Sequence, residues 1–344
     1  MLDLGPLLDL LPQPFTTADA ASVGVSRHVL ARGVPRGDLF RLSRGVYCSS
    51  AVWRAASPGA RHLLLADAVL RTTPGAVASH HSAALAWGLP MPIDAPPWVA
   101  ITLMHGHLTS RALSPARWHD GDLPADQVVR VRGGHRACRP DRTVVDCFRE
   151  LTLPDAVAVG DGALRSHLTT AEDLRTMRTW QRRWPGITRA DEGLPLLDGR
   201  RDTWLESWSF VRLWQLGVDL PEPQVTVLDE WGRFVGRVDG LWREGATVAE
   251  ADGVGKYLGA FSTGPSPEGA ARVVLEEKRR EDRLRDLGLE VVRWTWADVR
   301  RNPREVVARI EAARVRGDLG RFRGRLVSRP PLTALGARYA AISA

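Results

Sequence analysis

The order of hydrophobic patterns between residues 203 and 317 constrains the fold of this chain more than any other feature. A strongly periodic apolar helix, "TWLESWSFVRLWQLG", precedes three strand-like segments, "PQVTVLD", "RFVGRVDGLW" and "ATVAEAD". A long charged helix, the strand "LEVVRWTWADV" and the helix "PREVVARIEAARVRG" follow. Helix, three strands, helix, strand and helix predict an α/β sandwich that is small enough for one domain.

The whole chain is too long for one ordinary core. Its 344 residues predict several domains of a mixed α/β protein. We expect a winged helix-turn-helix domain over residues 1–55, a middle α/β domain over 56–195, a C-terminal α/β domain over 196–325 and a tail over 326–344. Gly, Pro and charged residues in "GITRADEGLPLLDGRRD" mark the connection into the C-terminal domain.

The first 55 residues contain three short helical segments, "LGPLLDLLP", "TTADAASVG" and "SRHVLARGVPRG", with Thr16 or Thr17 and then Ser26 as N-caps. The alternating segment "DLFRLSRGVYCSS" then predicts a two-stranded wing. In a winged helix-turn-helix the third helix enters the major groove and the wing contacts phosphates. The side chains predicted to bind DNA are Arg27, Arg32, Arg36, Arg41 and Arg44. A small helical interaction module is the alternative.

The charge of the chain points to an anionic partner. A net charge of +7 and a pI near 10.1 favour nucleic acid. No run approaches 18 apolar residues and the first segment lacks the positive region of a signal peptide, so we expect a cytoplasmic protein without membrane contact. The three cysteines, Cys48, Cys138 and Cys147, are too scattered for a zinc site or a disulfide framework and are expected to be buried thiols.

Polar residues in the middle region are expected to be structural. His80 and His81 are adjacent in "SHHSAALAWGLP", and adjacent helical residues point about 100° apart, so capping or packing is predicted for them. Asp141, Arg142 and Asp146 are expected to pair locally.

Three carboxylates in the C-terminal domain lie on successive predicted elements: Glu206 on the first helix, Asp239 on the second strand and Glu250 on the third. Carboxylates that hold Mg²⁺ can activate water against a phosphodiester. The chain has 47 Lys plus Arg, of which only Lys256 and Lys278 are lysines. A lysine ammonium is a compact charge that can orient such a water.

These residues resemble a nuclease family. Asp239 and "EADGVGKY" are similar to the PD-(D/E)xK pattern of very-short-patch-repair-like and DUF559-type proteins, and "LESWSFVRLWQLG", "PEPQVTV" and "EEKRREDRLRDLGLEVVRWTWADV" resemble its flanking elements over residues 198–310. The resemblance implies a restriction-endonuclease-like fold with Asp239 and Glu250 as metal ligands and Glu206 as a further acid. Asp252 stands where the pattern has lysine, and the "PD" dipeptide is "VD".

A second resemblance covers residues 1–170. The segments "RLSRGVY", "HHSAALAWGLP" and "RTVVDC" are similar to AbiEi-like antitoxins of abortive-infection systems. This resemblance implies DNA binding and a toxin or another defence-system protein as partner.

Together these observations predict a DNA-binding protein with a Mg²⁺-dependent (or Mn²⁺-dependent) endonuclease domain in phage defence or DNA repair. Asp239 and Glu250 would hold the metal with help from Glu206 or Asp252. The basic or water-orienting group would be Lys256, Lys278 or Gln224. Arg293 would contact DNA from the predicted strand that also carries Trp294 and Trp296, and the two tryptophans are expected to pack in the core. The alternatives are a non-enzymatic regulator or antitoxin whose nuclease-like domain only packs or forms a homodimer, and a defence component that docks to a protein.

Overall fold

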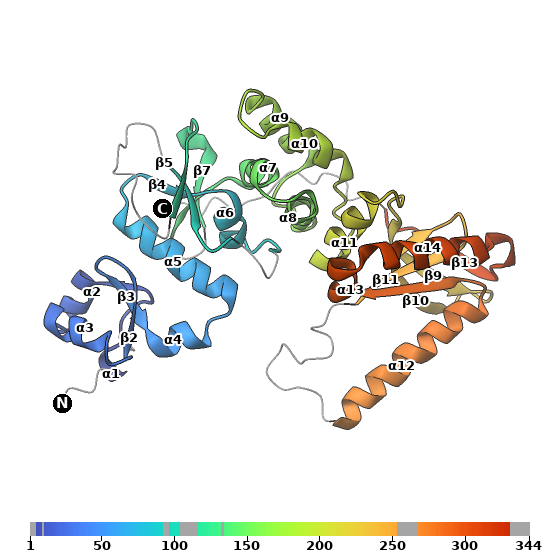
Figure 1. The fold of residues 1–344 in the computed structure, drawn as a ribbon, viewed down its shortest axis with the longest axis horizontal. Helices are drawn as coiled ribbons and strands as arrows, with labels where there is room; N and C mark the ends of the chain where they lie inside the picture. The colour runs from blue at the N-terminus through green and yellow to red at the C-terminus, as the bar shows by residue number, and fades with distance from the viewer. Residues whose placement is uncertain are drawn as a thin grey trace. The chain divides into compact units, whose positions relative to one another are not determined.

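The computed structural model describes residues 5–8, 10–91, 96–103, 116–131, 134–252 and 267–330 (Figure 1). The described residues form two compact units. The first runs to Glu150 and includes Glu172–Ile187, and the second comprises Leu151–Ala171 and the chain from Thr188 onward. The four-part division at residues 55, 195 and 325 stays a prediction. No helix within the described ranges combines the length and the apolar character needed to span a bilayer.

The N-terminal part of the first unit has the element order of a winged helix. Three short helices and a three-stranded antiparallel sheet, β1-β3-β2, pack around Phe15, Leu30 and Leu39. The elements are α1 (Gly5–Leu8), β1 (Phe15–Thr16), α2 (Thr17–Ser22), α3 (Arg27–Gly33), β2 (Leu39–Ser43) and β3 (Val46–Ser49). The predicted helices, their caps and the wing are confirmed, and β1 adds a strand to the wing.

The rest of the first unit is a five-stranded mixed sheet, of order β6-β5-β4-β8-β7, with helices packed against it. Its elements are α4 (Ser50–Ala55), α5 (Pro58–Thr72), β4 (Ala76–Ala78), α6 (His80–Ala86), β5 (Val99–Leu103), β6 (Ala116–His119), β7 (Val128–Arg130), β8 (Arg136–Cys138), α7 (Pro140–Glu150) and α9 (Ala171–Trp180). The three cysteines are free and buried, as expected.

Buried charge ties α7 to its surroundings. Arg142 pairs with Asp146 at 3.3 Å and donates to Gln127 Oε1 at 2.5 Å, while the rings of Trp180 and Trp184 lie near its guanidinium. Only 1% of the Arg142 side chain is exposed. The predicted local pairing on this helix is therefore confirmed.

His80 and His81 depart from the regular helical geometry assumed for them. Both are buried, which agrees with a packing role. However, His80 has a φ of +48°, outside the right-handed helical region. Its ring stacks on His119, and His81 Nδ1 lies 3.7 Å from the same Glu150 carboxylate oxygen as His119 Nε2. Both rings therefore lie beside Glu150, although adjacent residues of a regular helix would point about 100° apart.

The second unit contains the predicted α/β layers. A five-stranded sheet of order β12-β11-β10-β9-β13 has β11 and β12 parallel and its other neighbours antiparallel. Helices α11, α13 and α14 share one core cluster with it and α12 shares the other, so helices cover both faces (Figure 1). The elements are α8 (Leu153–Arg165), α10 (Thr188–Gly193), α11 (Trp204–Trp214), β9 (Glu222–Asp229), β10 (Phe234–Trp242), β11 (Thr247–Asp252), α12 (Pro267–Asp286), β12 (Glu290–Thr295), α13 (Trp296–Arg301), α14 (Pro303–Arg316) and β13 (Gly324–Val327).

Two boundaries in this unit differ from the sequence prediction. The last predicted strand stops at Thr295, because Thr295 and Asp298 form a reciprocal capping box that starts α13. Strand β13 (Gly324–Val327) pairs with β9, so it continues past residue 326, where the tail was predicted to start. Its pattern is mostly exposed, so hydrophobic alternation could not indicate it.

Candidate functional site

The first candidate site is the outer surface of α3. Helix α2 ends at Ser22, Gly24 adopts a φ of +81°, and Ser26 caps α3 through the N–H of Val29. A short turn with a left-handed glycine between two helices is typical of a helix-turn-helix. Leu30 points into the core, whereas Arg27 and Arg32 are exposed. Helix α3 therefore presents cationic side chains from a fixed backbone.

The wing extends this basic surface. Strands β2 and β3 pair from Leu39↔Ser49 to Ser43↔Val46, and the hairpin turns through Arg44 and Gly45, whose φ is +78°. Residues 10–55 contain six arginines and two aspartates. One of these acids, Asp19, caps α2, and the other, Asp38, pairs with Arg36.

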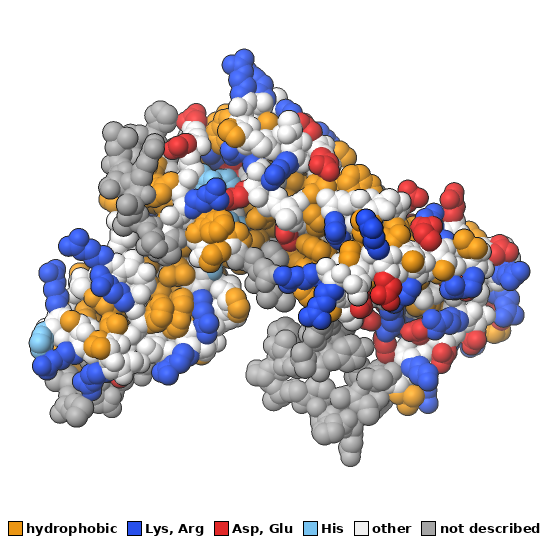
Figure 2. Space-filling view, viewed as in Figure 1, with side chains coloured by type: hydrophobic (Ala, Val, Ile, Leu, Met, Phe, Trp, Pro, Cys, Tyr) orange, Lys and Arg blue, Asp and Glu red, His pale blue; other side chains and the backbone are white. Residues whose placement is uncertain are grey.

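The arginines of α3 and the wing keep their charge available to solvent. Arg27, Arg32, Arg36, Arg41 and Arg44 are all exposed. Within the described part of the chain, no carboxylate pairs with Arg27, Arg32 or Arg44. Blue side chains surround the N-terminal elements at the lower left of Figure 2. Such a surface attracts polyanions.

The second candidate site lies where β10 and β11 separate. The strands pair as far as Gly240↔Ala249, and one residue further Asp239 lies opposite Glu250. The Asp239 carboxylate accepts the backbone N–H of Ala251 at 2.8 Å. Burial and the negative charge of Asp239 raise the pKa of Glu250 to about 7, although Arg280 and Arg293 oppose this. The predicted juxtaposition of Asp239 and Glu250 is thus present in the fold.

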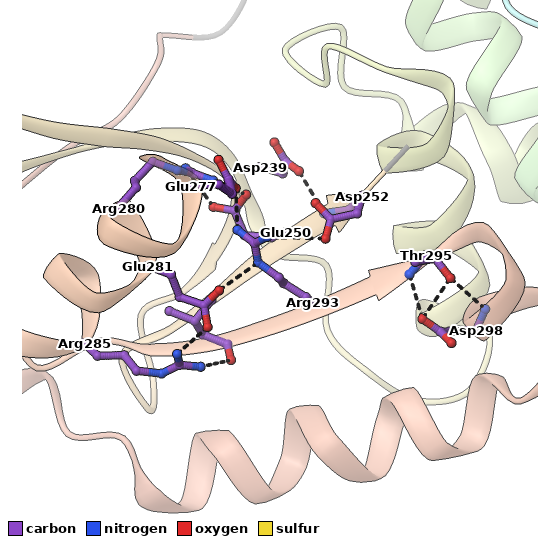
Figure 3. Close-up of polar contacts among 12 residues, drawn as sticks. Asp239, Glu250, Asp252, Glu277, Arg280, Glu281, Arg285, Arg293, Thr295 and Asp298 are labelled. Atoms are coloured by element: carbon purple, nitrogen blue, oxygen red, sulfur yellow. Dashed lines mark hydrogen bonds and ion pairs between the residues drawn. The ribbon is translucent and has the colours of Figure 1, made fainter. Parts of the chain in front are cut away.

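Arg280 of α12 occupies both oxygens of Glu250 (Figure 3). Its two terminal nitrogens donate to Glu250 at 3.1 and 2.9 Å, and one of them also donates to the carbonyl oxygen of Arg237. The Arg280 stem lies against Gly236, where an added Cβ would approach Cδ at 3.2 Å. Sequence reasoning missed Arg280. The pattern Glu277-x-x-Arg280 in the helix was the available signal, because residues three apart lie on one helix face.

Arg293 belongs to the same charged network and is not a free DNA contact. Its guanidinium binds Glu277, Glu281 and Asp252, which lie on α12 and β11 (Figure 3). Burial alone would raise the pKa of Glu277, but the guanidinium groups of Arg280 and Arg293 outweigh this effect and lower the pKa to about 2. The neighbouring Trp294 is 1% exposed and packs in the core, as predicted. Within the fold, Arg293 therefore balances acidic charge.

Glu206 and Gln224 form a buried pair, and Gln224 lies across from Asp239 in the register of β9 and β10. Glu206 accepts hydrogen bonds from Gln224 Nε2 at 2.7 Å, from Thr203 Oγ1 at 2.9 Å and from the N–H of Asp202 at 2.9 Å. It therefore completes the N-terminal cap of α11. Among the described residues, Glu206, Asp239 and Glu250 do not form a group of three metal ligands.

Of the two lysines, only Lys278 lies within the described residues. Lys278 is exposed on α12, whereas Glu250 is bound from the same helix by Arg280. Lys256 lies outside the described residues. The cation that the structure places at the acidic pair is therefore an arginine.

The family comparison bears on the N-terminal region. Residues 7–50 match the family described as "Transcriptional regulator, AbiEi antitoxin". Two curated relatives from Mycobacterium tuberculosis, the uncharacterized proteins MT2308 (strain CDC 1551 / Oshkosh) and Rv2248 (strain ATCC 25618 / H37Rv), are each 32% identical over 177 residues. That match covers 52% of this chain, and the chain spans only 61% of the length of these relatives.

The chain also has a weak similarity to a solved structure. It is the crystal structure of the RV2827C protein from Mycobacterium tuberculosis, with a TM-score of 0.38 and 16% sequence identity. The match covers 56% of this chain and 76% of that chain.

Proposed function

We propose that this protein is a DNA-binding transcriptional regulator of the antitoxin type, which binds DNA through α3 and the wing. The observation that carries the proposal is the match of residues 7–50 to the AbiEi family, on a helix-turn-helix whose exposed face holds unpaired arginines. The antitoxin part of the proposal implies a toxin as the partner protein.

The expected mode of binding follows from the geometry. The N-terminal end of a recognition helix contacts base edges in the major groove, and Arg27 and His28 are exposed in the first turn of α3. Arg41 and Arg44 of the wing would contact phosphates. Phosphate contacts make affinity depend on salt, with a slope of about −0.9 in log affinity against log salt for each contact.

The test is DNA binding by fluorescence anisotropy, using the promoter region of the protein's own gene and an unrelated duplex of equal length. The variant is the double substitution Arg41→Ala and Arg44→Ala in the wing. If each substitution removes one phosphate contact, raising the salt concentration from 50 to 200 mM should weaken DNA binding by a factor that is about 12-fold smaller for the variant than for the wild-type protein. The control is the double substitution Arg301→Ala and Arg304→Ala, which removes the same charge from exposed positions of α13 and α14. Equal binding by the wild-type and doubly substituted proteins would refute the proposal.

A Mg²⁺-dependent nuclease is a second candidate, favoured by the position of Asp239 opposite Glu250 on neighbouring strands. The described arrangement does not fit Mg²⁺ with Glu250 as a ligand, because Arg280 holds both Glu250 oxygens. An ion at this position would first have to displace Arg280.

Cleavage assays separate the two candidates. Supercoiled plasmid and single-stranded DNA are incubated with Mg²⁺ or Mn²⁺ and the wild-type protein, Asp239→Asn or Glu250→Gln. Metal-dependent cutting by the wild-type protein that both substitutions abolish would support the nuclease. Cutting that persists in both variants would point to a contaminant, and DNA binding without cutting would leave the regulator.

A further inference from the structure

A cluster of histidines in the first unit belongs to neither surface described above. His80 is the first residue of α6, His119 is the last residue of β6 and Glu150 is the last residue of α7. Each offers one ligand atom, and the three atoms lie within 4.8 Å of one another. His119 Nε2 and Glu150 Oε2 are 3.7 Å apart, which is too long for a hydrogen bond.

Buried polar atoms without hydrogen-bond partners point into this cluster. They are His119 Nε2, Glu150 Oε2 and His81 Nδ1. His81 is fully buried, and its Nε2 lies 2.9 Å from the carbonyl oxygen of Trp98, which can only accept. In the neutral ring, Nδ1 therefore carries a lone pair, and it faces Glu150 Oε2 at 3.7 Å. A lone pair opposite a carboxylate oxygen repels it unless the ring takes up a proton or a cation lies between or beside them.

The neighbouring imidazoles are also suited to donate lone pairs. The His80 and His119 rings stack with their centroids 3.7 Å apart. Burial lowers the pKa of His80 to about 3 and also lowers the pKa of His119. Metal ions require such neutral imidazole together with ionised carboxylate.

We propose that His80, His119 and Glu150 form a binding site for a divalent transition-metal ion, with Zn²⁺ as the ion that fits best. Zn–N and Zn–O bonds of about 2.0–2.1 Å in a tetrahedron place ligand atoms about 3.4 Å apart, close to the 3.7 Å between His119 and Glu150. Two imidazoles favour Zn²⁺ over Mg²⁺ or Ca²⁺, which prefer oxygen ligands. Three protein ligands leave a fourth position for water.

The surroundings fit an ion rather than a closed salt bridge. Arg117 lies 3.1 Å from Glu150 Oε1, and its side chain is 58% exposed. It therefore approaches one oxygen from solvent and leaves Oε2 facing the histidines. An ion at this point joins the start of α6, the end of β6 and the end of α7, three segments of one unit that are distant in sequence.

The test is Zn²⁺ binding by isothermal titration calorimetry on EDTA-treated full-length protein without a polyhistidine tag. The wild-type protein is expected to bind one Zn²⁺ per chain, and Co²⁺ substitution should give the visible absorption of a four-coordinate site. Glu150→Gln and His119→Ala should each weaken binding by at least about 100-fold. His28→Ala and Asp239→Asn, which alter an exposed histidine and the other acidic site, should bind like the wild-type protein.

Folding of the variants is checked by far-ultraviolet circular dichroism. The size-matched Glu150→Gln decides the outcome if His119→Ala does not fold. Zn²⁺ should also raise the Tm of the wild-type protein but not that of Glu150→Gln. The proposal is overturned if the wild-type protein shows no saturable binding up to about 100 µM Zn²⁺, or if Glu150→Gln binds with wild-type affinity.

Discussion

Burial of Glu250 beside Asp239 is expected to give the second unit a pH-dependent stability. Burial and the charge of Asp239 raise the pKa of Glu250 from 4.5 to about 7. An acid whose pKa is raised by folding stabilises the fold below its unfolded pKa, and this contribution is lost as the pH rises through the folded value. The pH window is therefore 4.5 to about 7, and at roughly 1.4 kcal/mol per pH unit the loss is about 3 kcal/mol.

Asp239→Asn isolates the part of this loss that comes from the like charge. Asparagine keeps an oxygen that can accept the N–H of Ala251. Burial is the larger of the two causes that raise this pKa, so removing the charge of Asp239 lowers the pKa only in part. We expect the free energy of unfolding to rise by about 1 kcal/mol at pH 8, and Tm to rise by about 2–4 °C for a unit of this size. At pH 5, where folded Glu250 carries its proton, no gain is expected.

The assay is thermal unfolding at pH 5 and pH 8 in low salt with EDTA, followed by circular dichroism. Glu230→Gln, in the exposed turn between β9 and β10, removes the same charge away from Glu250 and serves as the control. A gain of equal size at both pH values would show that Asp239 acts on stability independently of Glu250 ionisation. A loss of stability at pH 8 would refute the repulsion outright.

Two further substitutions test the packing on which the sites depend. Arg142→Met leaves the buried Asp146 without one of its cations, so the free energy of unfolding in urea should fall by about 3 kcal/mol; a fall below about 1 kcal/mol would contradict the paired geometry. Gly245→Ala should cost at least about 2 kcal/mol in the same assay, because Gly245 has a φ of +82° and an added Cβ would lie 2.5 Å from the carbonyl oxygen of Arg314. A neutral Gly245→Ala would mean that the turn between β10 and β11 is wrongly described.

Local signals in the sequence were sufficient for many of the elements. The N-caps Thr16 and Ser26 and the left-handed Gly24 mark the helix-turn-helix, and each acts through bonds to residues no more than a few positions away. The periodic apolar residues of α11 and the alternation of apolar and polar residues in β9 to β11 likewise predict which side chains of these elements are buried. Asp239 could be placed beside Glu250 because a short turn fixes the register of β10 and β11.

These local signals could not predict contacts between residues that are far apart in the sequence. His119 and Glu150 are 31 residues apart, and neither stands in a recognisable ligand spacing with His80. Their convergence depends on where β6 and α7 end in the folded unit. The φ of +48° at His80 is also a tertiary effect, since regular helical geometry would have turned the ring elsewhere. Strand β13 was missed for a similar reason, because its pairing with β9 is set by the fold and not by its exposed side chains.

Among the described residues the cations at the acidic site are arginines, and this bears on the chemistry of the site. A catalytic ammonium is a point charge that can leave carboxylate lone pairs free for a metal ion. A guanidinium instead presents paired N–H groups that match a carboxylate, and Arg280 uses this geometry to bind both oxygens of Glu250. Arg293 similarly neutralises the carboxylates of Glu277, Glu281 and Asp252. A nuclease-like set of acids that is closed by arginines fits a stabilising network better than an open metal site, which is why the exposed arginines of α3 and the wing carry the proposed function.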